Sequence, residues 1–205
     1  MNLVVCPCLS VCRWTTFAET VTAAVNPILG KNVSLQGGAF SGSSHSSTTG
    51  FSPQAIFQNG ILSSPAGSKI SQCVHPDRFT QLSLLQCFVL ILPFFSLRIS
   101  QHHYSATFCS GTEGKLQGLM SKASIRGNLT SFDSDIAAVK QSGLTYVLGE
   151  TNSVSCHGAP GVSNAAGAAL WGLDYALFAG QLGIDRLYFH QGIGYKYNLV
   201  RIDSF

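Results

Sequence analysis

The sequence has few charged side chains. Only 10% of its 205 residues are Asp, Glu, Lys or Arg, whereas soluble domains contain roughly 25%. The formal net charge is only +3, and no cluster of Lys and Arg accompanies it. Because a nucleic-acid site needs a concentrated positive surface, nucleic acid is not an expected partner. With 45% apolar residues, the chain can still bury one core of ordinary size.

The start of the sequence lacks a clear leader. Residues 1–12 are apolar, but no charged segment precedes them and no small-residue cleavage site follows. Seven cysteines indicate an oxidising compartment, although the odd count leaves at least one without a partner in the chain. Two N-glycosylation tripeptides, at Asn32 and Asn128, agree with export. These features fit a secreted, extracellular glycoprotein, and residues 1–24 are an N-terminal segment of uncertain assignment.

The sequence also lacks a metal-binding motif. Cys6, Cys8 and Cys12 lie close together, but no second ligand pair follows at zinc spacing. The histidines of the C-terminal half lie on different segments, which favours sugar-pocket or core positions; they are His102, His103, His157 and His190. We expect no metal and no cofactor.

Residues 73–100 differ from the rest of the chain. Leu82–Leu97 contains no charge and is interrupted by Pro93, and it is shorter than the roughly 20 residues of a membrane span. It can be an anchoring segment, a buried helix or an accidental insertion such as translated non-coding sequence. We favour the insertion because Ser68–Gln72 and Gln101–Ser105 look like one strand divided in two. Contact with a membrane is expected only through Leu82–Leu97.

The sequence on either side of this block alternates between strand and helix patterns, with a Gly- and Ser-rich loop at 37–50. The expected strands are 33–36, 102–108, 144–148 and 186–190, and the expected helices are 17–29, 53–62, 114–127, 132–141 and 164–183. This alternation is typical of βα units with a parallel sheet, so we predict the α/β class. Residues 25–72 and 101–205 form one predicted unit, interrupted by 73–100.

Glu150 is the main candidate for chemistry. It follows a buried five-residue strand, Leu144–Leu148, and functional groups of βα barrels lie where strands end. A carboxylate at such a place can be a glycosidase nucleophile, a metal ligand or an ion-pair partner. Spacing alone leaves these three roles open.

The residues around Glu150 resemble those of one enzyme family. The similar segments are Leu148–Ser153, Cys156–Asn164, Gly167–Trp171, Asp174–Leu177, Tyr188–Tyr195, Gln36–Phe40, Phe51–Ile56 and Gln101–Tyr104. They resemble glycoside hydrolase family 79, in particular its fungal β-glucuronidase and heparanase-like members. The resemblance covers 25–72 and 101–199.

The resemblance implies a retaining hydrolase of β-glucuronides, built on a (β/α)₈ TIM barrel of which this chain holds roughly strands five to eight. Glu150 then takes the role of nucleophile, and Tyr104 is expected to hydrogen-bond near it. Gly194 and Tyr195 match the loop that receives the carboxylate of the sugar, since a backbone N–H and a phenol are suitable donors to an anion. The partner is a glucuronide or a carbohydrate containing glucuronic acid.

The sequence also departs from the family. In the family, the glutamate that acts as acid and base follows an asparagine. No Asn-Glu pair exists in this sequence. Strands one to four and the C-terminal β-sandwich are missing, so we expect an inactive, truncated fragment; the alternatives are a non-catalytic carbohydrate-binding remnant and a small membrane-anchored protein. Cys109 and Cys156 lie just beyond neighbouring strands, and they are either a disulfide or two separate thiols.

Overall fold

The computed structural model describes residues 7–30, 37–40, 42–48, 50–64, 67, 98–110 and 114–199. Its sheet has four strands, and each strand runs parallel to its neighbours in the order of the chain. The strands are β1 (Gly37–Phe40), β2 (Arg98–Ala106), β3 (Thr145–Val154) and β4 (Arg186–Phe189). The predicted α/β class with a small parallel sheet is confirmed.

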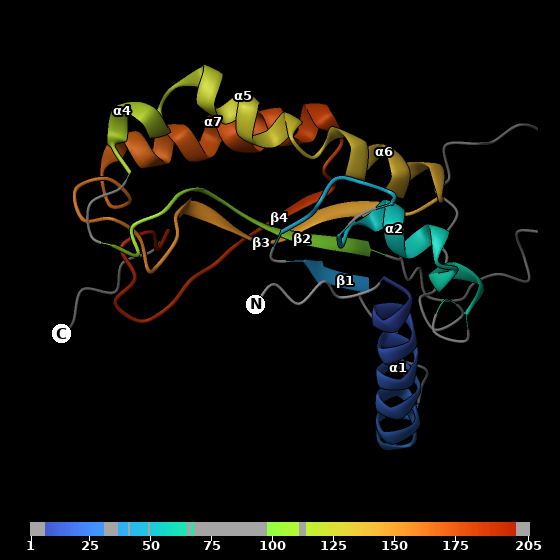
Figure 1. The fold of residues 1–205 in the computed structure, drawn as a ribbon. Helices are drawn as coiled ribbons and strands as arrows, with labels where there is room; N and C mark the ends of the chain where they lie inside the picture. The colour runs from blue at the N-terminus through green and yellow to red at the C-terminus, as the bar shows by residue number, and fades with distance from the viewer. Residues whose placement is uncertain are drawn as a thin grey trace, which may run out of the picture.

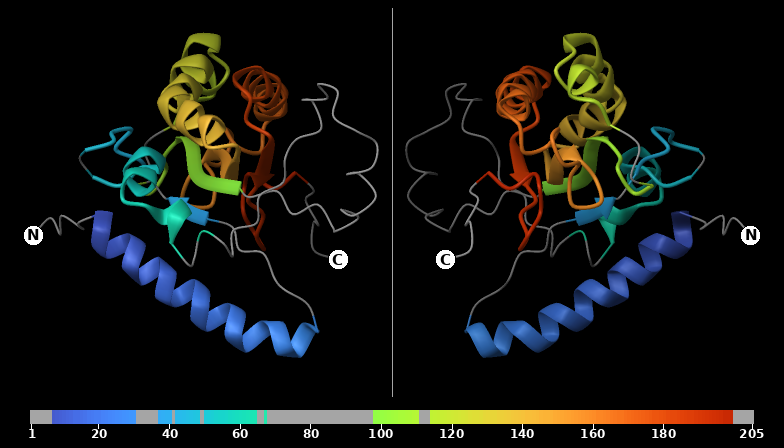
Figure 2. Two further views of the ribbon diagram at one scale, coloured as in Figure 1. Left: turned by 90° about the vertical axis from the view of Figure 1, so that its right-hand side faces the viewer. Right: turned by 90° about the vertical axis from the view of Figure 1, so that its left-hand side faces the viewer.

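Helices cover one face of this sheet. They are α4 (Leu116–Leu119), α5 (Lys122–Thr130), α6 (Asp133–Gln141) and α7 (Ala166–Leu182). Figure 1 shows these four helices together on one side of the sheet. The helix α1 (Pro7–Leu29) lies on the opposite side, as Figure 2 also shows. A short helix, α2 (Pro53–Gln58), and the 3₁₀ turn η1 (Ile61–Ser63) follow β1.

The core lies between the sheet and the helices α5, α6 and α7. Tyr146 and Leu148 of β3, Leu129 of α5, Val139 of α6 and Tyr175 of α7 are all fully buried. Burying one large apolar side chain stabilises a fold by roughly 1.5–3 kcal/mol. The core therefore fixes β3 firmly against the helices, and β3 carries the candidate nucleophile.

Two elements near the N-terminus differ from expectation. The first helix begins at Pro7, not near residue 17, so the boundary predicted after residue 24 lies inside α1; proline is favoured in a first helical turn. The strand β1 occupies Gly37–Phe40, where we expected a loop. Its backbone groups pair with β2 although glycine has a low strand propensity, so the composition does not reveal it. The strand predicted at 33–36 lies outside the described residues.

The second strand begins earlier than expected. β2 starts at Arg98, so residues 98–100, which we assigned to the insertion, belong to the sheet. The tripeptide Ile-Ser-Gln occurs twice, at 70–72 and at 99–101, and the second copy pairs with β1 and β3. β2 therefore includes the last three residues of the block that we assigned to the insertion. The origin of the block stays a prediction, because Leu82–Leu97 lies outside the described residues.

Two predicted helices are shorter than their sequence patterns suggest. Ser52 caps α2 as expected, since its hydroxyl accepts a hydrogen bond of 3.1 Å from the Ala55 N–H. The helix nevertheless ends before Gly60, whose φ of 78° is left-handed. The helix expected at 114–127 is divided into α4 and α5, because the Ser121 hydroxyl caps a new helix there. In the described part of the chain, no helix combines the length and hydropathy needed to cross a membrane.

Candidate functional site

Glu150 lies within β3 and not directly after it, because the strand continues to Val154. Gln101 pairs with Leu148 and His102 pairs with Glu150, so Gly149 is an extra residue in β3. Such a bulge bends a strand and changes the direction of the next side chain. The Glu150 side chain is 34% exposed, so the irregular register presents it at an accessible position.

Three side chains surround the Glu150 carboxylate. The Tyr104 hydroxyl donates a hydrogen bond of 2.7 Å to Oε1. The Nδ1 atoms of His102 and His190 lie 3.7 Å from Oε2 and Oε1, which is longer than a hydrogen bond. Tyr104 therefore fixes one carboxylate oxygen, and two imidazoles flank the group from β2 and from the end of β4.

Burial controls the protonation of the phenols beside Glu150. Burial, followed by the hydrogen bond to Glu150, raises the pKa of the Tyr104 hydroxyl far above its ordinary value. Burial also raises the pKa of Tyr197. Both phenols stay protonated over the physiological range, so Tyr104 can act as a permanent donor to the carboxylate.

A second group of contacts holds His190. Its Nδ1 lies 3.0 Å from the hydroxyls of both Tyr104 and Tyr197. The buried Asn152 amide donates to the backbone oxygens of His190, at 3.0 Å, and of Tyr197, at 3.4 Å. The loop after β4 is thus bound to β3 beside Glu150.

Tyr195, predicted to receive a sugar carboxylate, lies in this same loop. Its ring stacks on His157 with a centroid distance of 4.2 Å, and it meets His190 edge-on at 5.6 Å. A side chain at Gly192 would come within 2.3 Å of the Tyr195 ring, so glycine allows this placement. The Tyr195 N–H donates to Gly192 O, and Gly194 adopts a left-handed φ of 78°. With its backbone N–H engaged, Tyr195 can offer its phenol to a ligand.

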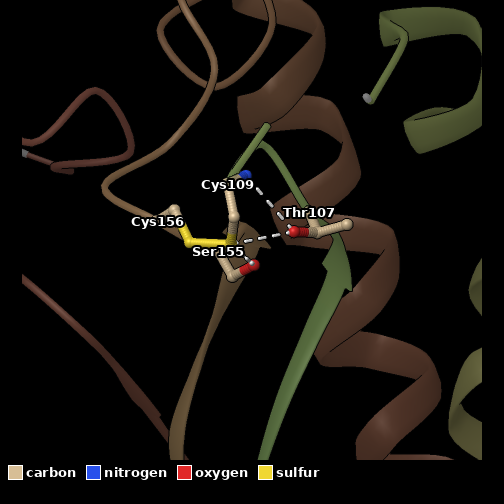
Figure 3. The surroundings of a disulfide bond; sticks show 4 residues. All are labelled: Thr107, Cys109, Ser155 and Cys156. Carbon is tan, nitrogen blue, oxygen red and sulfur yellow. Dashed lines mark hydrogen bonds between the residues drawn. A yellow bond between two sulfur atoms is a disulfide. The ribbon is translucent and has the colours of Figure 1, made fainter. Parts of the chain in front are cut away.

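A disulfide joins the loops that follow β2 and β3. Cys109 and Cys156, the predicted pair, are bonded with their Cα atoms 5.2 Å apart. Figure 3 shows the Thr107 hydroxyl, which accepts from the Cys109 N–H at 3.4 Å and lies 3.1 Å from its Sγ, and Ser155, which directly follows β3. Cys156 has a left-handed φ of 58°, which costs energy for a residue with a side chain. The cross-link holds the ends of the strands that carry Tyr104 and Glu150.

Sequence reasoning missed Tyr197 and did not assign His102 and His190 to the carboxylate. No motif distinguishes Tyr197, and its nearness to Tyr104 depends on the path of the loop after β4. His103 packs against the core, where its ring stacks on Tyr175. Within the residues that the structure describes, no group of three His, Cys, Asp or Glu side chains could hold a metal ion.

Comparison with known proteins gives partial matches. No protein-family model matches the sequence. A β-glucuronidase of Aspergillus niger is 53% identical over 55 residues, which are 27% of this chain and 10% of that protein. A β-glucuronidase of Neurospora crassa is 37% identical over 78 residues, which are 38% of this chain and 14% of that protein. The chain thus spans only a small part of the curated relatives that it matches.

A solved structure is similar over most of the chain. It is a 4-O-α-L-rhamnosyl-β-D-glucuronidase from Fusarium oxysporum in complex with Rha-GlcA. The two share a TM-score of 0.63 and 24% sequence identity, over 93% of this chain and 33% of that one. This likeness shows the fold. Together with the sequence matches, it makes the chain similar to fungal glucuronidases over part of their length.

Proposed function

We propose that this chain carries the nucleophile of a retaining β-glucuronidase of glycoside hydrolase family 79, and that the nucleophile is Glu150. The observation that carries the proposal is the 2.7 Å hydrogen bond from Tyr104 to Glu150 Oε1. It orients the carboxylate, and His102 stays 3.7 Å from Oε2. Oε2 therefore keeps its lone pairs for attack on an anomeric carbon.

The reaction needs a second carboxyl group. In a retaining glycosidase, the nucleophile forms an ester with the sugar while an acid roughly 5 Å away protonates the leaving oxygen. Of the other glutamates in the sequence, Glu19 lies exposed on α1 and Glu113 lies outside the described residues. Without a positioned acid the rate falls by about 10²–10⁴. We infer that this polypeptide alone does not turn over ordinary glucuronides.

The proposed substrate class follows from the loop after β4. Tyr195, held by its stack on His157, would donate its phenol to the carboxylate that distinguishes glucuronic acid from glucose. Gly194 would allow the loop backbone to approach the sugar closely. The site should therefore prefer a glucuronyl group over a glucosyl group.

The proposed architecture is part of a (β/α)₈ barrel in which β1 to β4 are strands five to eight. Its support is the parallel order of the four strands, with α4 to α7 on one face, and the likeness in fold to a glucuronidase structure. We also propose a secreted protein. The disulfide between Cys109 and Cys156 supports this, because such bonds persist in oxidising compartments.

A pair of activated sugars tests the proposed function. The fluoride of 2-deoxy-2-fluoro-β-glucuronyl fluoride leaves as an anion without protonation, so no acid is needed. The attack of Glu150 breaks the C1–F bond and forms a C1–O ester, and the fluorine at C2 slows its hydrolysis. We expect intact-mass spectrometry to show one glucuronyl group per chain, with much slower labelling by the glucosyl analogue. Equal labelling by both sugars would contradict the proposed substrate class.

A further inference from the structure

Hydrogen-bond contacts converge on one ring nitrogen beside Glu150. The Nδ1 atom of His190 lies 3.0 Å from the Tyr104 hydroxyl and 3.0 Å from the Tyr197 hydroxyl. A ring nitrogen carries either one proton or one lone pair, so the identity of the donor must be inferred from the network.

Counting protons identifies the donor. An ionised carboxylate only accepts hydrogen bonds, so the proton of Tyr104 lies toward Glu150 Oε1. The Tyr104 oxygen then faces His190 Nδ1 with a lone pair. If Nδ1 were unprotonated, two lone pairs would oppose each other at 3.0 Å. A proton on Nδ1 removes this conflict, because it can be donated to Tyr104 and shared with Tyr197.

We propose that His190 is a positioning residue that keeps its proton on Nδ1 and donates it to Tyr104, which in turn donates to Glu150. Hydrogen bonds in such a chain polarise one another, so the donation from His190 strengthens the bond that orients the carboxylate. The neutral ring then has an unprotonated Nε2, which accepts a hydrogen bond from a sugar hydroxyl. The role of His190 in catalysis rests on the proposed function, whereas the position of its proton does not.

The backbone and neighbouring rings keep His190 in place for this role. The His190 N–H donates to Thr151 O at 3.0 Å, and its carbonyl accepts from the Asn152 amide. Tyr195 meets the ring edge-on. The side chain is 39% exposed, so the ring remains accessible to a ligand.

The position of the proton can be observed directly. Long-range ¹H–¹⁵N spectra of protein labelled with ¹⁵N-histidine distinguish protonated from unprotonated ring nitrogens, and the loss of one set of signals in His190→Gln identifies His190. At neutral pH we expect a protonated Nδ1. An unprotonated Nδ1 in the wild-type chain would overturn the proposal.

Two tyrosine variants give opposite expectations. Tyr104→Phe removes the oxygen that opposes Nδ1, so Nδ1 can accept from Tyr197 and the proton should move to Nε2. Tyr197→Phe leaves that oxygen in place, so the proton should stay on Nδ1. Tyr188→Phe removes a partly exposed hydroxyl from β4 and is the matched control without effect. The same proton position in both Tyr104→Phe and Tyr197→Phe would contradict the network.

The positioning role is tested by the rate of labelling with the fluorinated glucuronyl sugar. Asparagine places its amide nitrogen near the position of Nδ1, and glutamine places it near Nε2. We expect His190→Asn to stay close to the wild-type rate and His190→Gln to lose about tenfold, the value of one hydrogen bond. Equal rates in the two variants would refute the positioning role. A wild-type chain that is not labelled at all, but has a protonated Nδ1, would refute the proposed function and leave the protonation of His190 established.

Discussion

His103 should make the stability of this protein depend on pH. Its partly buried ring packs against the core, stacked on Tyr175 and edge-on to Phe132 with a centroid distance of 5.3 Å. The buried Nε2 atom has no hydrogen-bond partner. Burial therefore lowers the pKa of His103 from 6.5 to about 4, because a charged ring would lose its hydration without gaining a partner.

The sign and size of the effect follow from this pKa. Above pH 6.5 neither the folded nor the unfolded chain protonates His103, so its contribution to stability is fully present. As the pH falls from 6.5 toward 4, the unfolded chain binds a proton that the folded chain does not bind, and the free energy of unfolding decreases. One pKa unit corresponds to about 1.36 kcal/mol. We expect a loss of roughly 2.5 kcal/mol between pH 7 and pH 4.5.

Urea unfolding at the two pH values measures this loss. His103→Phe keeps an aromatic ring in the core and His103→Gln keeps a polar group, but neither side chain can be protonated. Both variants should lose roughly 2.5 kcal/mol less than the wild type between pH 7 and pH 4.5. Carboxylates also contribute to the pH dependence, but equally in all three proteins. If the three proteins lose the same free energy, the account of His103 as a buried neutral ring is wrong.

Three other predictions concern the disulfide, the apolar block and glycosylation. Cys109→Ser combined with Cys156→Ser should lower the free energy of unfolding by about 4 kcal/mol for a separation of 47 residues, and a reductant should do the same to the wild type; an unchanged urea midpoint in reductant would contradict this. Deleting residues 73–101 leaves the same Ile-Ser-Gln-His sequence after Lys69, so unfolding should stay cooperative with no loss of stability; a non-cooperative transition would mean that the block belongs to the fold. In a secretory host, peptide mass spectrometry should find a glycan on Asn128, because a glycosylated amide keeps the one N–H that it donates to β2; an unmodified peptide from disulfide-bonded protein would contradict the assignment of Asn128 as a glycosylation site.

The class of fold could be predicted from the sequence, whereas the role of Glu150 stays a prediction. Strands alternate with helices at a spacing typical of parallel connections, and the described sheet has parallel order. Glu150 was selected by its strand and by the residues after it. The bond between Cys109 and Cys156 joins two positions that were expected just beyond neighbouring strands.

The sequence could not predict the register that forms the site. The extra residue Gly149 changes the pairing of β2 with β3; a glycine within a strand can mark a bulge, but it does not specify the register with a distant strand. Tyr104 is 46 residues from Glu150 and 86 residues from His190. These groups meet only because three parallel strands place them side by side, and Tyr197 joins them through a loop without regular structure. The strand β1 was not predicted for a related reason. It is a strand because it pairs with β2, and its glycine-containing sequence has no strand preference of its own.

The most direct test of the central claim is to locate the covalent sugar after reaction with 2-deoxy-2-fluoro-β-glucuronyl fluoride. Tandem mass spectrometry of peptides from the labelled chain assigns the ester to one carboxylate. Our account predicts the ester on Glu150, and Glu150→Gln, which keeps the shape of the side chain but cannot form the ester, should show no labelling. An ester on another residue, or undiminished labelling of Glu150→Gln, would contradict the claim that Glu150 is the nucleophile.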